Sequence, residues 1–518
     1  ELDADWSKVR FQAAPVAAVY NHPIYGAQLT GGSSSTWVEW ERVRKAGATA
    51  RAMLIAAAAA EWNVEASACS TEPGHVVHVT SGKRVSYGKL AEKAADLKPP
   101  ADVKTKDPKD FRIVGKSTKR LDTPDKVNGK AVFGIDVNLP SMLVAVVARS
   151  PVFGGKVKSF GGEKAKAVPG VKHVVQIPRG IAVVADGFWP AKKGREALSI
   201  DWEYGPLAGF DSFKQLDEYA NLAKKPGVTA RKDGNPAEAL RKAAKTFEAV
   251  YDLPYLAHGA MEPMNCVADV RTDRCEVWVG TQMQTADRAA AAEESGLKPE
   301  QVTLHTTLLG GGFGRRAAID NHFVREAVQI SKAVRAPVKV IWTREDDMRG
   351  GYYRPRAYHS VRAALDNAGA PVAWEQHIVC QSFLLGTPYA GMIKDGLDDL
   401  AVEGAKDIPY AIPNVRVDWH PAPNGVPTFQ WRSVGHSHTA FVVETLIDEL
   451  AHAAGKDPFE FRRGLLDKHP RARRVLEFVA EKAGWGKPPP QGQGRGIAVH
   501  ESFGSYAAHV AEVSVSDA

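Results

Sequence analysis

The feature that most restricts the fold of this chain is a run of four glycines around one aromatic residue, Gly310-Gly311-Gly312-Phe313-Gly314. Glycine loses more backbone freedom on folding than any other residue, so such a run marks a tight turn or a close approach to a ligand. Residues 301–307 alternate like a strand, and apolar side chains recur at helical spacing over residues 317–334. The run is therefore predicted to be a strand-to-helix turn whose unpaired amides face an anion or a cofactor.

The residues that follow the run sharpen this interpretation. Arg315 and Arg316 are expected to add positive charge to the pocket, and Phe313 is its one bulky wall. A tight turn without a ligand is the alternative. Two nucleotide motifs are excluded, because a P-loop ends in Gly-Lys-Ser/Thr and a dinucleotide fingerprint needs a third glycine where Arg315 stands.

The amino-acid composition limits the classes of protein to which the chain can belong. The 518 residues exceed one typical domain, and 44% hydrophobic with 25% charged residues is ordinary for a globular protein. The net charge of +7 is dispersed along the chain, which argues against a nucleic-acid partner. No apolar run reaches the roughly 18 residues of a membrane span. The four cysteines form no Cys-x-x-Cys pair, so neither an iron–sulfur cluster nor a structural zinc is expected within the chain.

The pattern of strands, helices and linkers predicts a multi-domain α+β protein. Residues 1–97 contain a Thr-Gly-Gly-Ser loop and an alanine-rich helix, and residues 98–110 are a linker rich in Pro, Lys and Asp. Residues 111–206 form a compact α+β unit that includes a strand over residues 130–137. Residues 207–518 alternate long strands and helices after a polar connector at residues 225–236, and a short strand is also expected within residues 1–12.

Several short stretches gain meaning from their order. Gln282 ends a strand before a helix, the glycine run follows about thirty residues later, and Trp431-Arg432-Ser433-Val434-Gly435 then leads into another helix. Together with His258-Gly259-Ala260-Met261-Glu262-Pro263 and Glu501-Ser502-Phe503-Gly504, this series resembles the molybdenum-binding large subunit of the xanthine oxidase family of molybdenum hydroxylases. It is most similar to the isoquinoline 1-oxidoreductase beta subunits, and residues 117–204 resemble the family's hammerhead domain.

The resemblance implies a role for each matching residue. Gln282 would hydrogen-bond near an oxo ligand of molybdenum, and Phe313 with Gly314 would line the apical side of the metal. Further contacts to the pterin or its phosphates would come from the backbone of Gly31, Gly32, Ser33, Gly311 and Gly312. Arg432 would lie near the active centre. No residue of the chain would be a direct ligand of the metal.

Two departures from the family pattern have consequences. The family often carries a carboxylate at the position of Ala317, and its absence disfavours purine-type substrates. The general base of the family is a glutamate in a late Gly-Val-Gly-Glu motif, which lies outside this sequence. The loop at residues 30–33 precedes the rest, as in the rearranged order of the isoquinoline-type subunits. The chain is therefore expected to be a permuted large subunit, truncated at both ends and inactive alone.

The implied activity is hydroxylation of N-heteroaromatic compounds with water as the oxygen donor. The cofactor would be molybdenum–molybdopterin in its cytosine dinucleotide form, and electrons would leave through a small [2Fe–2S] subunit, with a cytochrome c subunit as a further candidate partner. A periplasmic location, or the periplasmic face of the inner membrane, is expected from relatives. Two alternatives stay open: aldehyde oxidation at the same site coupled to a cytochrome, and a cofactor-free fragment that serves only as a binding or scaffold piece.

Each candidate residue also has a plainer interpretation. Arg432 is a structural salt-bridge arginine in that view. His258 and Glu262 lie four residues apart, but His-Glu-x-x-His is absent, so zinc is a poor hypothesis. His436 and His438 flank a helix start and are expected to be surface or capping residues.

Overall fold

The computed structural model describes residues 1–423 and 425–516 and divides the chain into two compact units. One unit is Glu1–Val137 with Arg274–Leu308, and the other is Asn138–Asp273 with Leu309–Ala518. The strand before the glycine run and the run itself thus belong to different units. The expected limits at residues 97, 110 and 206 are not limits of these units, and the domain assignment stays a prediction.

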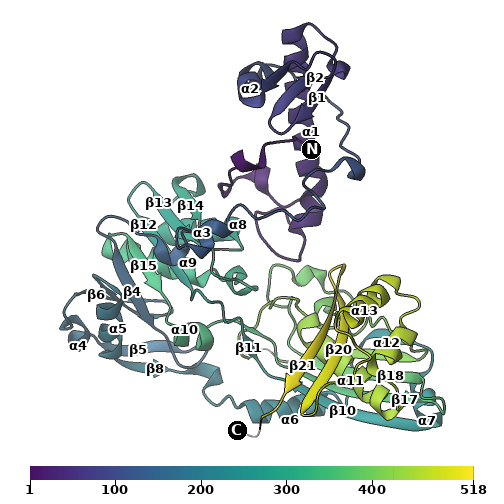
Figure 1. Ribbon diagram of the computed structural model, residues 1–518. Helices are drawn as coiled ribbons and strands as arrows, with labels where there is room; N and C mark the ends of the chain where they lie inside the picture. Colours follow the sequence, from purple (N-terminus) through teal and green to yellow (C-terminus); the bar gives the residue numbers. More distant parts are fainter. Residues whose placement is uncertain (424, 517–518) are drawn as a thin grey trace. The chain divides into compact units, whose positions relative to one another are not determined.

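The first unit begins with a long helix that is buried at one end only. The helix α1 (Ser35–Trp62) is followed by an antiparallel three-stranded sheet and a short helix (Figure 1). These elements are β1 (Cys69–Glu72), β2 (His75–His78), β3 (Arg84–Ser86) and α2 (Tyr87–Ala95). The alanine-rich end of α1 packs on them around Leu54, Val76 and Leu90, because small side chains let the backbones approach closely. The strand expected within residues 1–12 is wrong, since only a 3-10 turn, Trp6–Lys8, forms there.

The later segment of the first unit is a strand–helix–strand crossover. The strands β13 (Cys275–Val279) and β14 (Val302–Thr306) run parallel, with Val277 opposite Leu304. Between them lies α8 (Gln284–Ser295), which packs on both strands. Parallel strands need such a crossover. The helix ends at Gly296, whose φ of 78° gives the left-handed cap that favours glycine.

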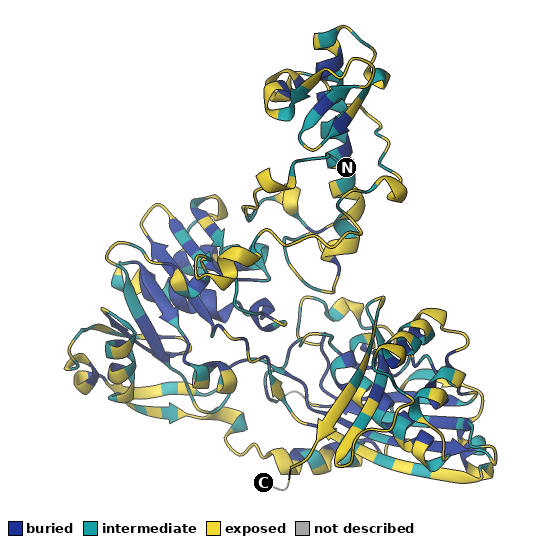
Figure 2. Cartoon of the chain, in the orientation of Figure 1, coloured by how far each residue is buried: buried dark blue, intermediate teal, exposed yellow. Residues whose placement is uncertain are grey.

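The second unit contains a sheet that is covered by helices. Its strands follow the order β12 (Asn265–Val270), β15 (Val338–Ile341), β4 (Leu143–Ala148), β7 (Gly180–Ala185) and β6 (Val171–Ile177). The helix α9 (His322–Val334) packs on β12 and β15, and α5 (Phe188–Glu196) packs on β4 and β7. Figure 2 shows buried residues concentrated in the strands of this sheet, and all six residues of β7 are buried. Its continuous apolar sequence is typical of a strand buried on both faces.

A second sheet of this unit carries its largest core. The order is β10 (Lys245–Leu253), β17 (Ala357–Leu365), β18 (Pro371–Cys380), β19 (Val415–Pro421) and β9 (Val228–Asp233). Alternate residues of a strand point to opposite faces, so Val361 joins the main core while Tyr358 faces α6 (Ser212–Leu222). The main core is shared with α11 (His436–Ala453), α12 (Pro458–Leu465) and α13 (Pro470–Lys482). The connector expected at residues 225–236 is wrong, because it contains β9.

Shorter elements complete the second unit. They are α4 (Glu163–Lys166), β5 (Lys156–Gly161), β8 (Ser199–Glu203), α7 (Pro236–Lys242), β11 (Leu256–Ala257), α10 (Arg344–Arg349), β16 (Tyr353–Arg354) and the hairpin of β20 (Gln493–Ser502) and β21 (Ser505–Ser514). In the first unit, α3 (Thr123–Val127) precedes residues 130–137, where the expected strand is wrong. A 3-10 turn, Gly134–Asp136, forms instead, because the Asp136 carboxylate accepts the Phe133 amide at 3.0 Å. The fold mixes helices with parallel and antiparallel strands, which confirms the predicted class at that level.

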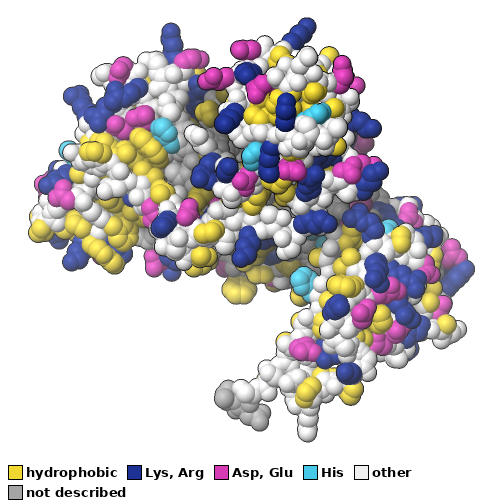
Figure 3. All heavy atoms as spheres, turned by 45° about the horizontal axis from the view of Figure 1, so that its top comes forward, with side chains coloured by type: hydrophobic (Ala, Val, Ile, Leu, Met, Phe, Trp, Pro, Cys, Tyr) yellow, Lys and Arg dark blue, Asp and Glu magenta, His cyan; other side chains and the backbone are white. Residues whose placement is uncertain are grey.

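The surface has interspersed charges. On the face that Figure 3 shows, basic and acidic side chains alternate without a large patch of one sign. Within residues 1–423 and 425–516, no helix has the length and apolarity to cross a membrane. The same residues contain no group of three or more His, Cys, Asp or Glu side chains that could hold a metal ion.

Candidate functional site

The glycine turn is fixed by the backbone and side chain of Glu262. The Gly310 amide donates to the Glu262 carboxylate at 2.8 Å, and the Glu262 amide donates back to the Gly310 carbonyl at 3.1 Å. An added Cβ at Gly310 would lie 2.4 Å from the Glu262 Cβ. This glycine is therefore required by the approach of residues 258–263 of the same chain.

The same carboxylate binds Arg316. Its guanidinium donates to the Glu262 carboxylate at 2.8 Å and to the Gly311 carbonyl at 2.8 Å, and both side chains are almost fully buried. Burial lowers the pKa of Arg316, and the Glu262 charge opposes that shift. A buried pair of this kind neutralises its own charge. The expectation that Arg316 adds positive charge to a pocket is therefore wrong.

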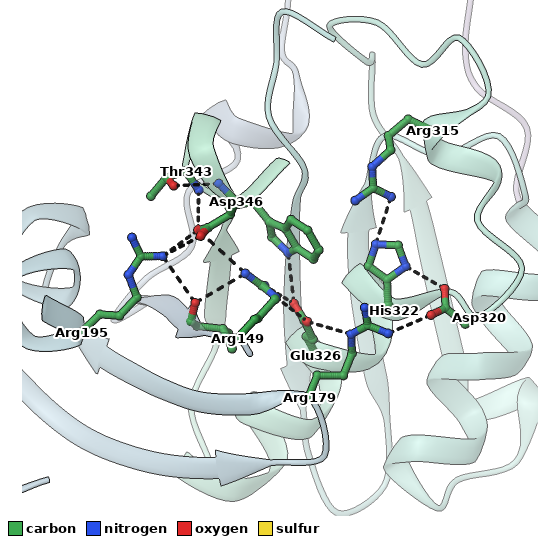
Figure 4. A network of polar contacts seen from close by, with 11 residues as sticks. Arg149, Arg179, Arg195, Arg315, Asp320, His322, Glu326, Thr343 and Asp346 are labelled. Carbon is green, nitrogen blue, oxygen red and sulfur yellow. Dashed lines mark hydrogen bonds and ion pairs between the residues drawn. The ribbon is translucent and has the colours of Figure 1, made fainter. Parts of the chain in front are cut away.

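Arg315 is also part of the protein interior. Its side chain is 2% exposed, donates to His322 Nε2 at 3.0 Å and lies 3.4 Å from the Asp347 carboxylate. Figure 4 shows this guanidinium directed at the His322 ring, whose other nitrogen contacts Asp320 at 2.7 Å. Burial lowers the pKa of His322 to about 4, so the ring is neutral at physiological pH.

The network of Figure 4 ties this region to the β4–β7 part of the sheet. Glu326 on α9 accepts two bonds from Arg149, at 2.9 and 2.5 Å, and a third from the Trp342 indole at 3.0 Å. Because α9 begins only at His322, the helix predicted from residue 317 is wrong at its start. A 3-10 turn, Arg315–Ala317, lies between the glycine turn and α9. The start of α9 is therefore separated from the glycine turn by residues 315–321.

The residue at the tip of the turn is strained and exposed. Phe313 has a φ of 58°, in the left-handed region that bulky residues rarely adopt, and its side chain is 42% exposed. Gly314 follows with a φ of 105°, and an added Cβ there would lie 2.0 Å from the Gln430 carbonyl oxygen. Strain of this kind is concentrated at functional sites. An exposed aromatic ring held at such a cost is consistent with the predicted wall of a pocket.

The arginine loop (residues 431–435) meets this turn through one backbone bond. The Arg432 amide donates to the Phe313 carbonyl at 2.8 Å. The next two residues, Ser433 and Val434, have φ values of 71° and 47°, and for a β-branched residue that conformation is an outlier. The Arg432 side chain is exposed and forms no ion pair with any residue that the structure describes. The plainer role as a salt-bridge arginine therefore has no support.

The other predicted residues meet in the first unit. The Thr30 amide donates to the Gln282 carbonyl at 2.8 Å, and the Gln282 side-chain amide donates to the Thr30 carbonyl at 3.1 Å. Gly32 and Ser33 follow with φ values of 63° and 52° and are exposed, just before the start of α1. Segments about 250 residues apart in sequence are thus joined. The structure brings the nine predicted residues together as two groups, one in each unit.

The donors of these groups suit an acceptor-rich cofactor. In the part of the chain that the structure describes, the amides of Gly311, Gly312 and Phe313 donate to no protein acceptor. A row of free amides beside an exposed ring fits a pterin with its carbonyl and phosphate oxygens. Gly310 and Gly314, in contrast, are explained by the packing of the chain itself. In this run, Gly310 and Gly314 are therefore needed for packing, while the amides of Gly311, Gly312 and Phe313 are available as hydrogen-bond donors.

Sequence reasoning missed the residues that support the turn. Glu262, which binds Arg316 in the structure, is one of them, and its place in a stretch that matches the family was the available signal. His436 and His438 are not surface residues, and that prediction is wrong. His436 Nδ1 lies 2.8 Å from His500 Nε2, and His438 Nδ1 lies 3.0 Å from His359 Nε2. The pairs are buried because α11 packs on β17 and β20.

Comparison with known proteins gives three consistent findings. Residues 219–465 match a molybdopterin cofactor-binding domain. The chain is 32% identical to the isoquinoline 1-oxidoreductase subunit beta of Brevundimonas diminuta over 99% of its own length and 71% of that protein. It is 29% identical to a membrane-bound aldehyde dehydrogenase [pyrroloquinoline-quinone] of Gluconacetobacter polyoxogenes, over 94% of this chain and 67% of that one.

The fold has a counterpart among solved structures. Quinoline 2-oxidoreductase from Pseudomonas putida 86 matches 74% of this chain with a TM-score of 0.58 at 19% identity. The chain spans 57% of that protein's length. By its identity to the isoquinoline relative over nearly its whole length, and by its matching cofactor-binding domain, the chain belongs to the xanthine oxidase family of molybdenum hydroxylases, as a molybdopterin-binding large subunit.

Proposed function

We propose that this chain is the molybdenum-cofactor subunit of an oxidoreductase that hydroxylates N-heteroaromatic compounds, isoquinoline-like in class, with water as the oxygen donor. The observation that carries the proposal is the strained, exposed Phe313, bonded through its carbonyl to the Arg432 amide at 2.8 Å. The identity to an isoquinoline 1-oxidoreductase subunit over 99% of the chain supports the substrate class.

The residues of this chain would bind and orient rather than carry the redox step. The cofactor, when bound, supplies the two-electron oxidation. The free amides of Gly311, Gly312 and Phe313 would hold its oxygens, and the Phe313 ring would exclude water from one side. The family resemblance also implies cofactor contacts for Gln282, Gly31, Gly32 and Ser33. Gln282 and Arg432 are the catalytic-site residues that this chain would supply.

The finer features of the complex are proposals that rest on resemblance. We propose the cytosine dinucleotide form of molybdopterin, a small [2Fe–2S] subunit as electron acceptor, a cytochrome c subunit as a further candidate, and a periplasmic location. The early position of the Thr30–Ser33 loop, joined to Gln282, supports the rearranged order of the cofactor domain. The isoquinoline relative is itself named as a subunit, which supports a multi-subunit enzyme.

Aldehyde oxidation is the second candidate, and the relative named as an aldehyde dehydrogenase favours it. The test compares turnover of isoquinoline, quinoline, nicotinate and benzaldehyde by the assembled enzyme, with incorporation of ¹⁸O from labelled water. Preferred turnover of the N-heterocycles supports the first candidate, and preferred turnover of benzaldehyde supports the second.

Cofactor content tests the third possibility, a fragment that only binds partners. Molybdenum analysis and pterin fluorescence after denaturation are measured on the assembled enzyme. A stoichiometric amount of both is expected. A complex without molybdenum or pterin that retains full activity would contradict the proposal.

A further inference from the structure

The short strand β16 has two neighbours that lead into the candidate site. On one side it pairs antiparallel with β11. On the other side, the Tyr353 amide donates to the Pro427 carbonyl at 3.1 Å, and the Tyr353 carbonyl accepts the Phe429 amide at 2.9 Å. His258 follows β11 directly, and Gln430 follows the other neighbour directly. These two residues therefore extend from segments that flank the same strand.

The His258 side chain bridges the two segments. It is buried, and its Nε2 lies 3.0 Å from the Gln430 carbonyl oxygen. Because a carbonyl oxygen only accepts, Nε2 carries the proton of this bond. Burial lowers the pKa of His258 to about 4, with the bond to Gln430 opposing the shift, so the ring is neutral at physiological pH. Only one nitrogen of a neutral ring carries a proton, so this bond fixes the tautomer of His258.

The same carbonyl group lies against the glycine turn. An added Cβ at Gly314 would lie 2.0 Å from the Gln430 carbonyl oxygen and 3.2 Å from His258 Nε2. The histidine bond and the turn therefore meet at one point. Two residues after Gln430, the Arg432 amide donates to the Phe313 carbonyl at 2.8 Å. A rotation of the peptide group that follows Gln430 would thus move the backbone of both site residues.

Trp431 adds a second contact between the same two segments. Its ring lies beside that of His258, with centroids 6.4 Å apart and planes inclined by 32°, and its N–H donates to the Ala257 carbonyl at 3.4 Å. The loop then continues through Ser433 and Val434, which have positive φ values. Strained residues persist only where their surroundings fix them. His258 and Trp431 fix the start of this strained loop.

We propose that His258 is a positioning residue for Arg432 and Phe313, and that it acts through the hydrogen bond from Nε2 to the Gln430 carbonyl. The inference rests on the proposed function, because it takes Arg432 and Phe313 as parts of the site. Without this donor the carbonyl group is free to turn, and the peptide before Arg432 loses its orientation. Because the bond joins two parts of the protein, its loss changes the alignment of the site more than the binding of substrate.

Three replacements of His258 separate the hydrogen bond from the packing. His258→Gln keeps a donor near the position of Nε2, His258→Asn carries the same amide on a side chain too short to reach Gln430, and His258→Met fills the space without a donor. In the assembled enzyme, with its preferred substrate, kcat should fall about tenfold in His258→Asn and His258→Met, while KM changes less than about twofold. In His258→Gln, kcat should recover to within about threefold of the wild type. Equal kcat in the Gln and Asn variants overturns the proposal.

His420 on β19 provides the matched control. It is buried and has a ring-nitrogen bond of similar length, 3.1 Å to His377. His420→Met makes the same chemical change in the second sheet, and kcat should stay within about twofold of the wild type. A loss of kcat as large as in His258→Met would show a general effect of destabilisation and would overturn the positioning role.

Hydrogen exchange separates this inference from the proposed function, because it needs no substrate. In the assembled enzyme, peptides of residues 309–317 and 430–435 should lose about tenfold protection in His258→Asn, since a carbonyl group is left without its donor. His258→Gln should restore that protection. Unchanged protection in His258→Asn overturns the inference even if the enzyme hydroxylates N-heterocycles. The expected loss and recovery in an enzyme that prefers aldehydes support the inference and refute only the substrate class.

Discussion

Replacing Gly314 by alanine tests whether the turn is shaped by the chain itself. The residue has a φ of 105°, and the added Cβ would stand 2.0 Å from the Gln430 carbonyl oxygen, where an ordinary contact begins at 3.4 Å. That carbonyl also accepts a hydrogen bond from His258 Nε2 at 3.0 Å. The backbone of residues 430–432 must therefore move, or Gly314 must leave its conformation.

The cost can be estimated from three contributions. A side chain at this φ costs about 1–3 kcal/mol, and overpacking against a backbone atom costs about 1–3 kcal/mol. Loss of the bond from His258 adds about 1 kcal/mol. Because relaxation relieves part of each, we expect a local destabilisation of about 3–5 kcal/mol. Gly259→Ala is the matched control, with a φ of 60° and no atom within 4 Å of the added Cβ, and should cost about 1 kcal/mol.

Hydrogen exchange is the suitable assay, because a multi-domain chain has no single free energy of unfolding. The peptides to follow cover residues 309–317 and 430–435. Gly314→Ala should lower protection in both by more than about a hundredfold, and Gly259→Ala by about fivefold, since 1.4 kcal/mol is a factor of ten. Equal protection in the two variants would refute the packing argument and would leave the cofactor as the reason for this glycine.

Three further predictions follow from the same region. Arg316→Met leaves the buried Glu262 carboxylate without its cation and should destabilise the surrounding structure by about 3–5 kcal/mol, measured as lower hydrogen-exchange protection of residues 309–317. Adding Glu262→Gln should restore part of that protection, and a purely additive double variant would contradict a direct pair. Phe313→Gly removes the left-handed strain, so the Tm should rise slightly or stay unchanged while kcat/KM of the assembled enzyme falls at least about tenfold; full activity would show that the ring has no role. Acid should destabilise the second unit, because burial lowers the pKa of His359 from 6.5 to about 3. The unfolded chain binds the proton first as the pH falls, so stability that is present above pH 6.5 is lost, by about 2 kcal/mol at pH 5. His359→Gln should therefore reduce the change in Tm between pH 7 and pH 5.

Local sequence patterns were sufficient to predict most of the helices and strands. The continuous apolar residues of Gly180–Ala185 are sufficient to predict a buried strand there. The glycine run also predicted a tight turn at residues 310–314, and the structure has positive φ at Gly311 and Gly314, where glycine is favoured. The strand β9 was missed because its charged residues read as a connector, and an edge strand is stabilised by the ladder it joins rather than by its own side chains.

The sequence by itself determined which residues could form the site, because their order in the chain carries the family resemblance and their types set the available donors. The tertiary structure alone decided what surrounds them. Arg315 and Arg316 look like free positive charge in sequence, yet they are buried against Asp347 and Glu262, which lie far from them along the chain. The burial of His436 beside His500 depends on α11 packing against distant segments. Charge and protonation depend on neighbours brought together by folding, and no local pattern encodes them.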